Sequence, residues 1–196
     1  MSGLRETKKA ATRTTMSRAA ARLALAGGAE SLTVAAVSDA AGVSPRTFHN
    51  YFTSMEQALL EFIVDRSTTL ARLLNDVPAE VGLFDAVEQV AIDQLRTSGD
   101  DGDVDSLAAL FRLGDVLQTI TGSAGRPEYP EHMAPIVETV LPRFAGADRF
   151  TSQVAINTAV TVARTALETY YALPEPRDPE DGVTLLHRAF SVVRLE

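Results

Sequence analysis

The chain has 196 residues, of which 29 are alanine, a composition that favours helices, and it contains no cysteine, so disulfides and thiolate zinc sites are excluded. No apolar run reaches the roughly 18 residues that a membrane-spanning helix needs, and no apolar segment before Thr12 could form a signal peptide. The net charge of −8, taken alone, argues against binding to nucleic acid. The charge is unevenly distributed, however: residues 1–55 carry seven basic and three acidic side chains, a net charge of +4, which leaves −12 for residues 56–196.

The first elements of the chain are a basic arm and a helix. Residues 1–9 predict a flexible basic arm, and apolar residues at helical spacing predict a helix over residues 10–26. The pair Gly27–Gly28 ends it. This helix is expected to pack across the two shorter helices that follow.

Residues 32–56, LTVAAVSDAAGVSPRTFHNYFTSME, hold two short helical patterns separated by a sharp turn. Thr33 is a candidate N-cap for the first pattern, and Gly42 suits the left-handed conformation in which many helices end. Ser44 is a second candidate N-cap, and Pro45 stands at the first helical position, where proline is tolerated. The pattern predicts a helix-turn-helix.

The second helix of this pair buries Phe48 and Phe52, four residues apart, and leaves a polar face. A helix of about nine residues is not stable alone, so it must be docked on the first helix, which holds its polar face rigidly. In the major groove, Arg46 could form a bidentate pair with guanine, and Asn50 matches adenine. Thr47 could contact a thymine methyl group or a phosphate.

The segment SLTVAAVSDAAGVSPRTFHNYFTSMEQAL resembles the N-terminal DNA-binding segment of the tetracycline-repressor (TetR) family of bacterial transcription regulators, and the resemblance covers roughly residues 13–60. It implies base and phosphate contacts from the recognition-helix positions, and phosphate contacts from the two cap positions. The candidate DNA-binding residues are Thr33, Ser44, Pro45, Arg46, Thr47, His49, Asn50 and Tyr51. Thr33 and Ser44 could also act only as caps, and His49 and Tyr51 could serve local packing. Met55 replaces a lysine that the family usually carries.

Six further helices are expected, over residues 55–75, 82–96, 104–121, 131–145, 148–172 and 179–194, and the one over 148–172 is the longest. The helix over 104–121 is apolar nearly all round, which indicates a buried position. The loop SGDDGDVD before it lacks the spacing of a calcium loop, and Asp103 or Asp105 is expected to cap the helix.

The resemblance implies an all-α protein of about nine helices. Residues 1–53 would form a three-helix DNA-binding domain with its basic arm, and residues 54–196 a larger effector-binding and dimerisation domain. The expected partners are a double-stranded DNA operator and a second copy of the chain, joined through the helices over 148–172 and 179–194. The alanines of the helix over 148–172 would permit close approach. The helix over 148–172 also has a stripe of residues at heptad spacing that is polar in its middle. This stripe could be the edge of the dimer interface, the wall of a pocket or a face exposed to solvent.

The function expected from these features is that of a cytoplasmic, nucleoid-associated repressor, which a small and largely apolar effector releases from its operator. Periodic apolar residues are usually ordinary core, which is the alternative interpretation of the effector-site residues. They are Phe62, Phe84, Leu107, Phe111, Met133 and Val137, with Gln118 or Asn157 as polar anchors.

No enzyme is expected, because the chain has three histidines and no phosphate loop, metal cluster or nucleophile elbow. Neither a cofactor nor a metal ion nor a membrane partner is expected. The alternative function is that of a helical dimeric adaptor without specific DNA binding, which Met55 favours.

Overall fold

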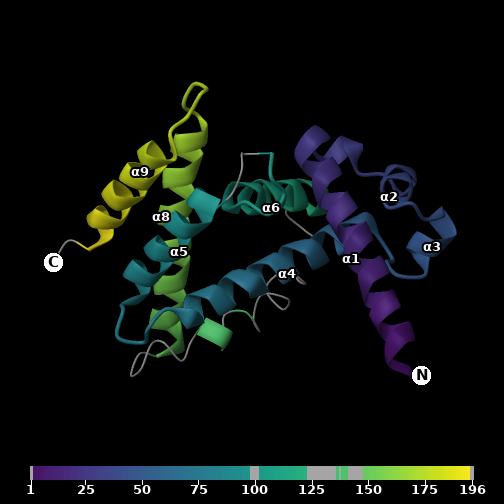
Figure 1. The fold of residues 1–196 in the computed structure, drawn as a ribbon, viewed down its shortest axis with the longest axis horizontal. Helices are drawn as coiled ribbons and strands as arrows, with labels where there is room; N and C mark the ends of the chain where they lie inside the picture. The colour runs from purple at the N-terminus through teal and green to yellow at the C-terminus, as the bar shows by residue number, and fades with distance from the viewer. Residues whose placement is uncertain (1, 98–101, 123–135, 137, 141–147, 195–196) are drawn as a thin grey trace. The chain divides into compact units, whose positions relative to one another are not determined.

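The computed structural model describes residues 2–97, 102–122, 136, 138–140 and 148–194. Its regular elements in these ranges are all helical, which confirms the predicted all-α fold. The α-helices are α1 (Ser2–Gly27), α2 (Val34–Ala40), α3 (Pro45–His49), α4 (Met55–Asp76), α5 (Leu83–Thr97), α6 (Leu107–Thr121), α8 (Arg149–Tyr171) and α9 (Pro179–Val193), with a 3-10 turn, η1 (Ala29–Ser31), after α1 (Figure 1).

The chain divides into two compact units. The first contains Met1–Arg66 and Arg112–Pro130, and the second contains Ser67–Phe111 and Glu131–Glu196. The division therefore falls inside α4 and inside α6. The domain boundary predicted at residues 53 and 54 stays a prediction.

The first unit is built on the packing of α1, α2 and α3. Met16 and Ala20 of α1, Val37 of α2 and the two phenylalanines Phe48 and Phe52 form a fully buried cluster. Five side chains, from α1, from α2 and from residues 45–52, thus share one core, which none of these segments could bury alone.

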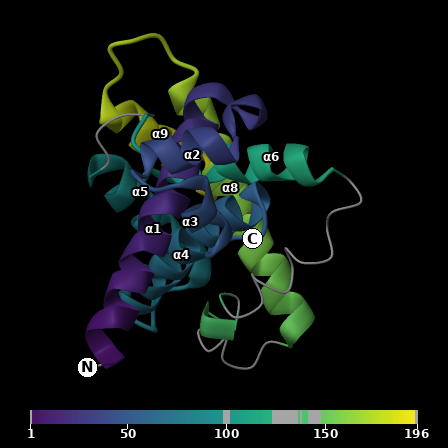
Figure 2. The same cartoon turned by 90° about the vertical axis from the view of Figure 1, so that its right-hand side faces the viewer.

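The flexible arm predicted for residues 1–9 is wrong for residues 2–9, which form the first turns of α1. In Figures 1 and 2 these turns run past α2 and α3. Leu4, Arg5 and Lys8 are good helix formers, and the Thr7 hydroxyl donates to the Gly3 carbonyl at 2.8 Å. The local preference of the chain therefore continues α1 beyond the part that packs against α2 and α3, although residues 5–9 are exposed.

The second unit is centred on α5, α8 and α9, which pack side by side (Figure 1). Its core joins Leu95 of α5, Ala163 and Leu167 of α8, and Leu186 and Phe190 of α9. Small side chains bring the helices together: Ala159, Ala163 and Ala166 of α8 are all buried in this core. The alanines that suggested close approach to a second copy therefore serve packing within the chain.

Polar contacts reinforce the same three helices. Arg96 of α5 forms a bidentate pair with Glu180 of α9, with Nε–Oε1 at 3.0 Å. Glu88 is buried between α5 and α9, where it accepts from His187 Nδ1 at 2.8 Å and from Arg194. Because a buried carboxylate is costly without partners, these contacts select one packing of α9 on α5.

Most predicted helix bounds lie within three residues of the observed ones. The cap and the burial of α6 differ from the prediction. Ser106, rather than Asp103 or Asp105, caps α6: its hydroxyl accepts from the Ala109 amide at 3.0 Å, while Asp103 closes a turn by accepting from the Asp105 amide. The helix is not buried all round, because Arg112, Asp115 and Gln118 are exposed. Of the helix predicted over 131–145, residues 136 and 138–140 are helical and the others lie outside the described residues.

Candidate nucleic-acid interface

The turn between α2 and α3 is held by hydrogen bonds that the sequence specifies. The Thr33 hydroxyl accepts from the Ala36 amide at 3.1 Å and caps α2. At the other end of α2, Gly42 has φ of +66°, a conformation in which a side chain would be strained. The amide of Val43 then donates to the Ser38 carbonyl at 2.9 Å, which turns the chain toward α3.

The helix α3 begins at a second cap. The Ser44 hydroxyl accepts from the Thr47 amide at 3.1 Å, and Pro45 occupies the first helical position. The helix ends at His49, so the predicted length of about nine residues is wrong. The Asn50 amide still donates to the Arg46 carbonyl at 3.2 Å, and the chain continues as a turn. We call residues 45–52 the recognition segment.

Two aromatic rings anchor the recognition segment. Phe48 and Phe52 are completely or almost completely buried, and their ring centroids lie 5.5 Å apart. The imidazole of His49 meets the Phe48 ring edge-on at 5.6 Å. These contacts fix which face of the segment is turned away from the core.

The outward face carries groups that can contact DNA. Arg46, His49 and Asn50 are exposed, while Thr47 and Tyr51 are half-buried. The Thr47 hydroxyl lies 2.9 Å from that of Ser44, so both hydroxyls take part in the cap. Thr33, Ser44 and Pro45 are exposed at the starts of the two helices, where amide groups can also bind phosphate.

The sequence profile of the bacterial regulatory proteins of the tetR family matches residues 17–62, which contain the last part of α1, all of α2 and α3, and the start of α4. This segment of the chain is therefore similar to the DNA-binding segment of the TetR family. No curated protein sequence matches it. Among solved structures, a TetR family protein from Vibrio parahaemolyticus, described as a proposed transcriptional regulator, is 16% identical, with 92% of this chain and 97% of that chain covered at a TM-score of 0.50. That likeness concerns the fold.

The TetR family consists of bacterial regulatory proteins, and the matched residues of this chain form a helix-turn-helix. Proteins of this family are generally not enzymes and typically act on DNA operators as dimers. Within the ranges that the structure describes, no helix is both long and apolar enough to cross a bilayer.

Met55, which replaces the usual TetR-family lysine, is half-buried and packs against the core of α1, α2 and α3. The start of α4 is instead capped by Ser54, whose hydroxyl accepts from the Gln57 amide at 3.2 Å. Gln57 reaches back to accept from the Thr53 amide at 2.8 Å. Met55 thus joins α4 to the core of α1, α2 and α3 through apolar contact.

Arg13 is a residue of this interface that the sequence analysis did not identify. It reaches from α1 to the Tyr51 carbonyl, to the Phe52 ring and to Glu61 of α4. Arg13 and Tyr51 are 38 residues apart in the sequence, so no short-range sequence pattern indicates their contact. An arginine on the inner side of the predicted first helix, with an acid in the buried face of the fourth, was the available signal.

The predicted effector-site residues are divided between the two units. Phe84, Leu107 and Phe111 pack against the core of the second unit, whereas Phe62 is buried in the first. Gln118 and Asn157 are exposed, and Asn157 accepts from Gln153 Nε2 at 3.0 Å. Met133 and Val137 lie outside the described residues. The effector site stays a prediction.

Proposed function

We propose that this protein is a TetR-family repressor, which binds a specific operator as a homodimer, and that a small, largely apolar effector releases it. The base-reading residues in this proposal are Arg46, Thr47, His49 and Asn50, and Tyr51 contacts the DNA backbone or a base edge. Thr33, Ser44 and Pro45 face phosphates at the ends of the two helices.

The observation that carries the proposal is the split between the two faces of the recognition segment. Phe48 and Phe52 are buried, whereas Arg46, His49 and Asn50 are exposed. Within the described part of the first unit, the side chains of Arg46 and Asn50 make no hydrogen bond or ion pair, so both could turn toward bases. Arginine and asparagine are the side chains that pair in two-pronged fashion with guanine and adenine.

Charge supports the same orientation. Arg5, Lys8, Lys9 and Arg22 are exposed on α1, in the part of the chain with a net charge of +4. The remainder of the chain is strongly acidic. A polyanion would attract the first part and repel the rest, which favours approach through the helix-turn-helix.

A dimer would give the short recognition segment enough base pairs to be selective, because helix-turn-helix dimers read two half-sites. We place the interface on α8 and α9. Phe150 and Val154 of α8 and Val192 of α9 are large apolar side chains that the single chain leaves exposed. The heptad stripe of α8 is likewise mostly exposed, which fits an interface edge or a solvent face.

Release from the operator requires an effector that binds the DNA-bound and the released conformations of the protein with different affinities. An effector with equal affinity for both would not change their populations. We place its apolar contacts among Phe84, Leu107 and Phe111, which are half-buried beside the core of the second unit. A reporter gene behind the bound DNA, with and without the protein, would measure the sign of regulation.

The decisive experiment selects DNA duplexes from a random library with the wild-type protein and compares two variants. Arg46→Ala should lose about 1–3 kcal/mol of discrimination at one base pair. Arg72→Ala is the matched control, because Arg72 is exposed on the part of α4 that belongs to the second unit. Equal affinities of wild type and Arg46→Ala across a panel of single-base operator variants would reject the assigned role of Arg46.

The second candidate function is that of a helical dimeric adaptor without specific DNA binding. The packing of Met55 into the core, where a lysine could have reached a phosphate, favours it. Titrating salt separates the two functions: an operator-binding dimer loses affinity log-linearly as salt rises, whereas an adaptor protects no DNA at any salt concentration.

A further inference from the structure

We propose that Arg13 is a positioning residue for DNA binding: paired with Glu61, it fixes the C-terminal end of the recognition segment against α1 and α4. The inference rests on the proposed function and adds a residue that does not itself contact DNA. All of the groups concerned belong to the first unit, within Met1–Arg66.

One guanidinium group connects three elements. Arg13 Nη1 donates to the Tyr51 carbonyl at 3.0 Å, at the end of the recognition segment. Its Cζ lies 4.6 Å from the centroid of the buried Phe52 ring. Nε and Nη2 form an ion pair with the Glu61 carboxylate on α4. A lysine could not meet the ring, the carbonyl and the carboxylate together, because its ammonium group lacks the planar fork.

The recognition segment needs support at this end. With five residues, α3 cannot be stable by itself. Ser44 caps its start and Phe48 buries its middle. Carbonyl groups at a helix C-terminus lack intrahelical partners and carry partial negative charge, so a cation placed there is favourable. Arg13 supplies both the donor and the charge.

Glu61 orients Arg13 in this arrangement. Both side chains are about one-third exposed, at 35% and 31%. An exposed ion pair adds little to stability, so the expected effect concerns geometry. With the carboxylate occupying its fork, the guanidinium is held toward Tyr51 and Phe52. Without the carboxylate, the long arginine side chain can move away from Tyr51 and Phe52, and residues 50–52 are then no longer held at a fixed distance from α1.

The competing role for Arg13 is a direct phosphate contact, and the two roles predict opposite signs for Glu61→Gln. If Arg13 binds phosphate, removing Glu61's charge frees the guanidinium and strengthens DNA binding. If Arg13 positions the recognition segment, the same substitution weakens specific binding, even though it removes a negative charge from the DNA-binding unit. Glu56→Gln is the matched control, because it removes a charge from the first turn of α4 without touching Arg13.

The experiment measures affinity, by fluorescence anisotropy, for the duplex that the wild-type protein selects and for a scrambled duplex of equal length. Glu61→Gln and Arg13→Gln should each weaken binding to the selected duplex about tenfold and change binding to the scrambled one little. The double variant should bind no more weakly than Arg13→Gln alone, because the two residues act through one contact. Glu56→Gln should not weaken binding.

Tighter binding by Glu61→Gln would overturn the inference, and so would equal losses on the selected and scrambled duplexes. A second readout is independent of DNA: amide hydrogen exchange at residues 50–52, whose amides donate to carbonyls of α3, should accelerate in Glu61→Gln but not in Glu56→Gln. If the wild-type protein selects no sequence, the proposed function fails. Unchanged exchange would reject the positioning role whether or not DNA is bound.

Discussion

At the scale of single residues, Ser38 of α2 carries a buried hydroxyl without a hydrogen-bond partner among the residues that the structure describes. It is 1% exposed, and its Oγ is unsatisfied. A buried polar group left unpaired costs about 1–3 kcal/mol. Ser38→Ala removes that cost and little volume, so we expect it to raise the free energy of unfolding by about 1 kcal/mol, as measured by urea denaturation.

Ser17 of α1 is the matched control for this prediction. It is also buried, but its hydroxyl donates to the Thr14 carbonyl at 3.0 Å. Ser17→Ala should therefore leave stability unchanged or lower it by about 0.5–1.5 kcal/mol, the net contribution of one hydrogen bond. Equal effects of the two substitutions would show that hydrogen bonding does not distinguish these positions.

The cap of α8 gives a prediction for pH. The pKa of Asp148 lies below its ordinary value of 3.8, first because the Thr151 hydroxyl donates to it at 2.6 Å and next because the Thr151 amide donates at 3.0 Å. The fold thus favours the charged carboxylate. Its contribution is complete above the unfolded-state pKa and is lost as pH falls through the lower folded-state pKa.

We expect the first turn of α8 to loosen as the pH is lowered below 3.8. The chemical shift of the Thr151 amide, followed by NMR during the titration, should report this change. Asp148→Asn keeps an oxygen acceptor at the cap but does not titrate. Its Thr151 shift should stay constant over the same pH range. A titration that is identical in wild type and Asp148→Asn would assign the effect to another group.

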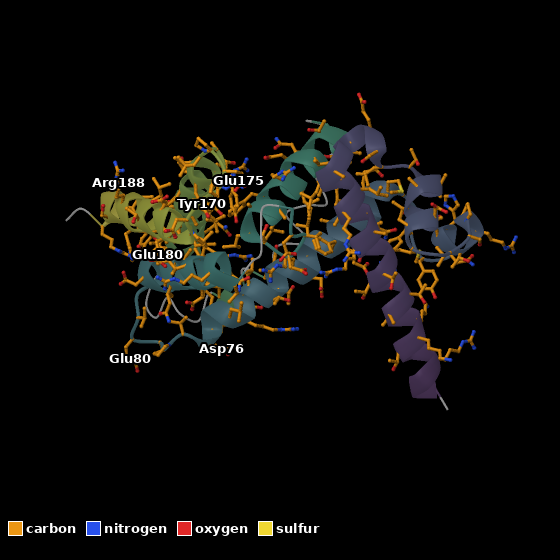
Figure 3. The ribbon with its side chains drawn as sticks, turned by 45° about the horizontal axis from the view of Figure 1, so that its top comes forward. Asp76, Glu80, Tyr170, Glu175, Glu180 and Arg188 are labelled. Atoms are coloured by element: carbon orange, nitrogen blue, oxygen red, sulfur yellow. The ribbon has the colours of Figure 1, made fainter. Side chains whose placement is uncertain are left out.

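At the scale of elements, Gly182 sets how closely α9 approaches its neighbours. A Cβ atom there would lie 2.5 Å from Leu95 Cδ2 of α5 and 3.0 Å from Tyr170 Cγ of α8. Figure 3 shows Tyr170 where α8 meets α9. Alanine has the better helix propensity by about 1 kcal/mol, but overpacking costs about 1–3 kcal/mol. We expect Gly182→Ala to lower the unfolding free energy.

Gly114, inside α6, separates propensity from packing. A Cβ atom there would meet nothing within 4 Å. Gly114→Ala should therefore raise the free energy of unfolding by about 0.5–1 kcal/mol. Thermal denaturation of both variants checks the pair. A gain in stability from Gly182→Ala would mean that Leu95 and Tyr170 repack without cost.

The helix-turn-helix could be predicted from sequence because its determinants are local. Thr33 and Ser44 cap helices at the expected positions, and Gly42 adopts a positive φ. Caps and turns depend on residues within about four positions of each other. The bridge from Arg13 to Glu61 spans 48 residues and required the fold.

The remaining differences have the same origin. Apolar residues around α6 predicted a helix enclosed on all sides, but periodicity does not say how many neighbours a helix has. The alanines of α8 face α5 and α9 rather than a second chain. A stripe of small residues indicates close approach, but the sequence alone does not identify the partner.

At the scale of the whole molecule, the exposed apolar residues of α8 and α9 bear on assembly. Phe150 is 78% exposed and Val154, one turn later, is 48% exposed, while Val192 of α9 is 64% exposed. Large apolar side chains exposed one turn apart favour an interface. In a two-fold dimer each would occur twice, so one substitution acts on both sides of the interface.

Val154→Asp should therefore convert the proposed dimer into a monomer, since it places two carboxylates within an apolar contact. Light scattering at micromolar concentration should give half the wild-type mass, with unchanged helical circular dichroism. Affinity for the selected duplex should fall with the mass, because a monomer reads one half-site. Gln89→Asp adds the same charge on an exposed position of α5 and should leave the mass unchanged. A wild-type monomer, or a Val154→Asp dimer of full mass, would place the assembly surface elsewhere than around Val154.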